Sequence, residues 1–184
     1  MNQFNKKYLL LVILVFLMAL TRNSHSLTSL SFPDATFAIF FIGGYSFKNI
    51  RWFSFLFLLS TLIDATSSFM NPSMNLWHNI SYFGLIFAYG VMWLGGFFSI
   101  KIKSPIYYIL NSMIITVIAF IVSTQTFNLL SGSFSNITLQ KSIQIGWEYL
   151  PQTLIYTMAY LLAYWVIKSL FKCQFIFFKK AKLL

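Results

Sequence analysis

The acidic residues are the first candidates for chemistry, because only three occur among 184 residues. Asp34 stands directly before an apolar run in "FPDATFAIFFIGG", Asp64 lies inside "LLSTLIDATSSFM", and Glu148 follows a tryptophan. A carboxylate in membrane hydrocarbon costs on the order of 3 kcal/mol and usually faces a partner or a cavity. Asp64 is therefore predicted either to line a site or to form a buried structural bond, and the residue types leave both readings open.

The other two acids have local explanations at helix ends. Asp34 is predicted to cap the helix that follows it, since a carboxylate accepts unpaired amides and suits the positive end of a helix. That role does not exclude lining a site as well. Glu148, before the last expected span, is predicted to cap a helix rather than to bind a ligand. Arg22 is the lone cation at the outer end of the first apolar segment, so it is the expected partner of one acid, although the sequence does not say which.

The two histidines are candidate metal ligands. His78, in "NLWHNISYF", has two possible roles. It is either an interfacial residue in an aromatic belt beside Trp77 or a metal ligand that binds through a neutral imidazole nitrogen. His25 lies in the preceding outer loop. No further ligand stands at zinc spacing, so a zinc site made of protein ligands alone is not expected. No nucleophile elbow, phosphate loop or HExxH motif occurs, and the chain is not expected to be an enzyme.

The elements that must position these residues are membrane spans. Hydrophobic residues make up 58% of the chain and charged residues only 9%, whereas soluble domains carry about 25% charged residues. We predict an all-α integral membrane protein, a single domain over 1–184 with six spans. The expected spans are about 8–21, 35–47, 52–70, 80–100, 105–123 and 151–171.

The basic residues orient these spans. Eleven of the thirteen fall on one face under this assignment, and only Arg22 and Lys141 fall on the other. Loops rich in Lys and Arg are cytoplasmic, so both termini are predicted to be cytoplasmic, as in a multi-pass protein of an inner membrane. The basic clusters suit an anionic leaflet rather than nucleic acid. The first segment also resembles a signal peptide, but no clean cleavage site follows it, and the other five spans keep their orientation either way.

The first two expected spans are short, since about 14 helical residues rise only about 21 Å against a hydrocarbon core of about 30 Å. We therefore expect an outward-facing concavity, with residues 22–34 dipping into it and the second and third outer loops completing its wall. Glycine pairs occur in "FFIGGYSFK" and "MWLGGFFSIK". Each pair is predicted to be a close contact between helices.

Three blocks of this sequence resemble the BtuM family of cobalamin transporters. They are "ALTRNSHSLTSLSFPDATFAIFFIGG", "LIDATSSF" and "FAYGVMWLGG", which together span about residues 19–96. This family is related to the substrate-binding S components of energy-coupling factor (ECF) transporters. The resemblance implies a six-helix, ECF S-component-like bundle in a bacterial inner membrane, with a cobalamin pocket open to the periplasm. The expected ligand-binding residues are Arg22, His25, Asp34, Asp64, Trp77, Tyr82 and Tyr89.

The sequence departs from that family at two points. Members can carry a cysteine before the fourth helix as a ligand to the cobalt, and His78 stands at about that place here. His78 is thus the expected axial cobalt ligand, while thiolate-dependent chemistry on the cobalt is put in doubt. The first helix lacks the small residues four apart with which S components usually dock on an energising module. Solitary function is therefore favoured over a shared ECF module.

Two other functions remain open at this point. The chain could be an S-component-like binder of another vitamin or precursor, or a membrane scaffold subunit that transports nothing. For the cobalamin transporter, no cofactor of its own is expected, because cobalamin would be the transported ligand.

Overall fold

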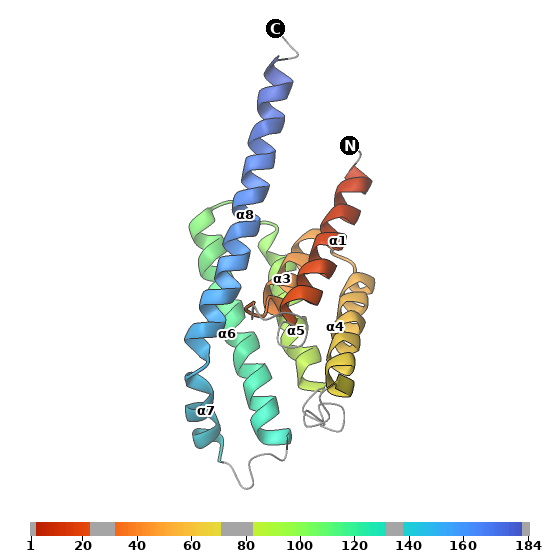
Figure 1. The fold of residues 1–184 in the computed structure, drawn as a ribbon. Helices are drawn as coiled ribbons and strands as arrows, with labels where there is room; N and C mark the ends of the chain where they lie inside the picture. The colour runs from red at the N-terminus through yellow and green to blue at the C-terminus, as the bar shows by residue number, and fades with distance from the viewer. Residues whose placement is uncertain (1–2, 23–31, 71–82, 132–137, 182–184) are drawn as a thin grey trace.

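The described residues of the computed structural model fold entirely into α-helices and connections. They comprise 3–22, 32–70, 83–131 and 138–181. Seven helices occur in this part of the chain (Figure 1). They are α1 (Gln3–Arg22), α3 (Thr36–Phe47), α4 (Ile50–Met70), α5 (Gly84–Ser99), α6 (Pro105–Leu130), α7 (Leu139–Trp147) and α8 (Leu150–Ala181).

Three of these helices are long and apolar enough to cross a membrane, by length and composition: Ile50–Phe69, Pro105–Leu130 and Leu150–Leu170. They confirm membrane-helix character at three of the six predicted spans. The segments predicted at 35–47 and 80–100 correspond to the shorter helices α3 and α5, which have 12 and 16 residues. A 12-residue helix rises only about 18 Å, so α3 cannot cross the hydrocarbon core by itself.

Helix boundaries differ from the prediction mainly where polar residues continue a helix. Helix α1 has 20 residues and includes Lys6 and Lys7, so it is longer than the apolar segment expected at about 8–21. Helix α6 runs seven residues beyond its expected end at 123. A hydroxyl there bonds within the helix, since Thr126 Oγ1 donates to the Val122 carbonyl at 2.6 Å. Polar side chains that bond within their own helix do not end it.

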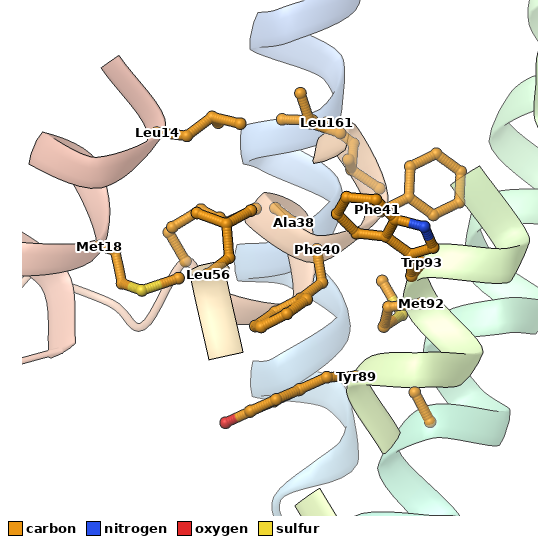
Figure 2. Close-up of a cluster of buried hydrophobic side chains, with 14 of the residues drawn as sticks. Leu14, Met18, Ala38, Phe40, Phe41, Leu56, Tyr89, Met92, Trp93 and Leu161 are labelled. Carbon is orange, nitrogen blue, oxygen red and sulfur yellow. The ribbon is translucent and has the colours of Figure 1, made fainter. Parts of the chain in front are cut away.

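The short helices form the centre of the bundle. Most side chains of α3 are buried, as expected for a helix that is hydrophobic on all sides. Figure 2 shows Phe40 and Phe41 of α3 between Leu14 and Met18 of α1 and Met92 and Trp93 of α5. The rings of Phe40 and Tyr89 stack at 4.5 Å with an interplanar angle of 10°. This core therefore ties α1, α3 and α5 together.

The two glycine pairs confirm the predicted close contacts, and they meet each other. A Cβ added to Gly44 would lie 2.0 Å from the carbonyl oxygen of Trp93 on α5. A Cβ added to Gly96 would lie 1.9 Å from the carbonyl oxygen of Phe41 on α3. Helices α3 and α5 therefore pack backbone against backbone at these positions, which any side chain would prevent.

Candidate functional site

An ion pair joins the end of α1 to the middle of α4. Arg22 is the last residue of α1, and its Nε and Nη2 donate to the two carboxylate oxygens of Asp64, each at 2.6 Å. The two side chains are only 9% and 12% exposed. A guanidinium fork matches a carboxylate in this two-bond geometry. The structure thus identifies Asp64 as the acid that meets Arg22, a choice that the sequence left open.

The remaining nitrogen of the guanidinium group reaches two further helices. Arg22 Nη1 donates to the hydroxyl of Thr36 at 2.9 Å and to the hydroxyl of Tyr89 at 2.8 Å. Thr36 begins α3, and Tyr89 lies in the second turn of α5. One arginine therefore connects four helices through hydrogen bonds, which satisfies its charge within a buried setting.

Asp34 extends this network toward solvent. Its Oδ1 accepts the backbone amide of Thr36 at 2.9 Å and also the Thr36 hydroxyl. The assigned cap residue of α3 is Ala35, one residue later than predicted. The predicted interaction, a carboxylate accepting a first-turn amide, is nevertheless present. Arg22, Asp34 and Asp64 together carry a formal charge of −1, and Asp34 is the exposed member.

A cavity of about 520 Å³ lies against this network. Asp34 and Tyr89 belong to both the network and the cavity wall. The rest of the wall comes from the segment before α3, from α3 itself, and from α5, α6 and α8: Phe32, Pro33, Phe37, Leu85, Phe120, Ser123, Thr124, Gln152, Thr153, Tyr156 and Thr157. This lining combines aromatic faces with hydroxyl and amide groups, which is a common composition for small-molecule sites.

The cavity lies at the end of the bundle away from the chain termini. Its walls come from the beginnings of α3, α5 and α8 and from the last third of α6. Helix α8 runs from this end to the C-terminal end, where the start of α1 also lies (Figure 1). A cavity is thus present at one end of the bundle, with Phe32, Pro33 and Asp34 in its wall as expected, while most of the loop wall predicted for the concavity lies outside the described residues.

The predicted site residues divide into two groups. Arg22, Asp34, Asp64 and Tyr89 come together in one network, although they lie on four separate segments. His25, Trp77, His78 and Tyr82 lie outside the described residues. Glu148 is the C-cap residue of α7 and is exposed, away from the network. Within the described residues, no three His, Cys, Asp or Glu side chains group to hold a metal.

Sequence reasoning missed the wall that α8 contributes. Gln152, Thr153, Tyr156 and Thr157 all line the cavity. Their spacing places 152 with 156, and 153 with 157, on adjoining strips of one helix face. This polar strip in the first two turns of an otherwise apolar span was the available signal. Thr36 was also missed, although its hydroxyl links Arg22 to Asp34.

The comparisons with known proteins leave the function to be argued from this site. No protein-family model matches the chain, and no curated protein matches it significantly. What the fold defines is a helical membrane protein with a cavity at one end of the bundle, built over a charged network.

Proposed function

We propose that this protein captures cobalamin in an outward-facing pocket and takes it up across a bacterial inner membrane, as a small S-component-like transporter. The observation that carries the proposal is the 520 Å³ cavity at the end away from the termini, walled by several helices and by Asp34 and Tyr89 of the Arg22 network. With the termini in the cytoplasm, as the basic residues favour, that cavity opens to the outside. We propose no catalytic role.

The chemistry of the cavity wall supports a large, neutral, amphipathic ligand. A corrinoid has apolar ring faces and a periphery of amide groups that donate and accept hydrogen bonds. Phe37, Phe120 and Tyr156 offer aromatic surface, while Gln152 and Thr153 offer amide and hydroxyl groups. The exposed carboxylate of Asp34 is an acceptor for amide N–H donors. The lining thus provides a partner for each part of the corrinoid surface.

The size of the cavity indicates where the ligand would extend. Cavities of about 300–1,000 Å³ hold drug-sized molecules, and a corrinoid is larger than these. It would therefore project from the helical wall toward the connections at this end of the bundle. In sequence, His25 falls between α1 and α3, and His78 falls between α4 and α5. We propose His78 as the axial ligand of the cobalt, since imidazole is a good ligand for cobalt.

Visible absorption spectroscopy of the purified protein tests this proposal. Cobalamin added to the protein and then freed of excess should remain bound and give corrin absorption bands. His78→Ala should move those bands toward the spectrum of free cofactor and weaken binding, whereas His25→Ala should change neither. An unchanged spectrum and affinity in His78→Ala would remove His78 from the cobalt while leaving the pocket in place.

A second ligand class is favoured by the cavity volume itself. A smaller vitamin or precursor would fit within 520 Å³ without extending beyond the helical wall. If the protein fails to retain cobalamin but a smaller vitamin raises its melting temperature, this alternative replaces the first. If neither is retained, the network and cavity serve a scaffold subunit. Uptake by the chain alone, without an ECF module, would support solitary function.

A further inference from the structure

A second cavity lies near the chain termini, far along the bundle from the first. It has a volume of about 200 Å³ and is lined by Lys7, Tyr8, Phe47 and Trp52. These residues come from the first turns of α1, the end of α3 and the first turn of α4. The Trp52 ring packs against Tyr8 at 6.3 Å and against Phe47 at 5.4 Å between centroids. The aromatic part of the wall is therefore held in place by ring contacts.

One basic residue lines this cavity, and two more are adjacent in sequence to lining residues. Lys7 forms part of its wall, and Lys48 and Arg51 flank Phe47 and Trp52 in sequence. All three basic residues are exposed. Lys48 has a φ of 59° and is the one described non-glycine residue with positive φ, which produces the sharp turn between α3 and α4. The three acids of the chain lie elsewhere, at the other cavity, within α4 and after α7. This cavity therefore favours an anion.

An apolar surface continues from the cavity along both flanking helices. On α1 the exposed large apolar residues after Tyr8 are Leu9, Val12, Ile13, Phe16 and Leu20, and on α4 they include Phe55, Leu58 and Leu62. Each set follows helical spacing, so each forms one stripe along its helix. Since α4 is apolar and long enough to cross a membrane, these stripes suit hydrocarbon. A ligand with a charged head and apolar chains matches the whole surface.

We propose that this cavity binds the headgroup phosphate of an anionic phospholipid, with the acyl chains lying along the α1 and α4 stripes. Lys7 and Arg51 would neutralise the phosphate, while Tyr8 and Trp52 would cover the glycerol region at the membrane interface, where aromatic rings are favoured. Basic pockets between helices on the cytoplasmic side are known to suit such headgroups. This inference does not depend on the ligand of the first cavity.

Native mass spectrometry of the full chain in detergent, titrated with phosphatidylglycerol or phosphatidylcholine, tests the proposal. Phosphatidylglycerol should bind more tightly. The variant Lys7→Gln/Arg51→Gln should bind it about 30-fold more weakly, since each basic side chain contributes about fivefold near an anionic headgroup. Trp52→Leu should also weaken binding, by removing part of the wall without changing the charge.

The matched control removes two charges from another exposed loop. Lys101 and Lys103 are both exposed and precede α6, so Lys101→Gln/Lys103→Gln should leave phosphatidylglycerol binding unchanged. An equal loss in this control would overturn the proposal, because it would show attraction to net charge alone. Equal binding of phosphatidylcholine would overturn it as well. Displacement of the lipid by millimolar inorganic phosphate would instead assign the cavity to a soluble anion.

Discussion

Arg22 is the residue on which the site depends most. Its guanidinium group donates four hydrogen bonds, two to Asp64 and one each to Thr36 and Tyr89. Lysine could not replace it, because an ammonium group lacks the planar arrangement of N–H groups. In arginine that arrangement binds both carboxylate oxygens and still leaves a nitrogen to donate to the Thr36 and Tyr89 hydroxyls. The arginine therefore both neutralises Asp64 and fixes the positions of α3 and α5 relative to α1.

Removing the carboxylate of Asp64 should be severely destabilising. Asp64→Leu leaves the buried Arg22 charge uncompensated, and breaking a buried ion pair in this way costs about 3–5 kcal/mol. Thermal unfolding of the purified protein in detergent should show the loss as a lower melting temperature. Glu148→Gln, which alters an exposed acid, should leave the melting temperature unchanged.

A paired variant separates the unpaired charge from lost packing. Arg22→Leu/Asp64→Leu removes both charges and should recover most of the stability lost in Asp64→Leu, because apolar replacement of a whole buried pair is often neutral. The remaining deficit should reflect the Thr36 and Tyr89 hydroxyls, which lose their common donor. A double variant as unstable as Asp64→Leu would show that the charge was not the cause.

At the scale of the helices, the close packing of α3 against α5 holds the cavity wall in place. Both helices contribute to the cavity, through Phe37 on α3 and through Leu85 and Tyr89 on α5. Their glycine contacts lie a few turns below, where the two backbones touch. The separation of these helices at the cavity is therefore set by residues that do not line it.

Alanine at the contacting glycines should loosen this pair. In Gly44→Ala and Gly96→Ala the new methyl group would meet a backbone carbonyl oxygen at 2.0 Å and 1.9 Å, and backbone cannot move aside as a side chain can. We expect each substitution to cost about 1–3 kcal/mol, the usual range for overpacking. Gly90→Ala is the matched control on α5, since no atom lies within 4 Å of the added Cβ. Similar melting temperatures for all three variants would contradict the proposed contact.

The sequence predicted some of these features and missed others, and each outcome has a physical reason. Glycine pairs and an intramembrane carboxylate are expensive without a specific partner. Their types alone therefore predicted a close contact for the glycines and, for Asp64, either a site-lining role or a buried bond. The choice of Asp64 over Asp34 for Arg22 depends on how α1 packs against α4, which a single sequence does not encode locally. Helix α7 escaped prediction because it has only nine residues, too few to show a clear helical period. Its threonine cap was the available signal, with Thr138 accepting the Lys141 amide at 3.4 Å.

At the scale of the whole molecule, charge and cavities are arranged along one axis. The acids and the larger cavity lie toward one end, whereas described basic residues such as Lys7 and Lys168 lie toward the end that carries both termini (Figure 1). Arg22, one of the two basic residues at the first end, is neutralised by Asp64. Among the described residues, this pairing leaves the exposed positive charge mainly toward the end that carries the termini.

This asymmetry predicts the orientation of the chain in the membrane. Exposed basic residues resist transfer across an inner membrane, so the terminal end and the turn between α3 and α4 should both face the cytoplasm. Reporter fusions that are active on one side only, placed after residue 184 and within 48–51, should both report a cytoplasmic position. A fusion at 132–137, between α6 and α7, should report the opposite side. A periplasmic signal from either of the first two fusions would contradict this topology, and with it the outward opening of the larger cavity.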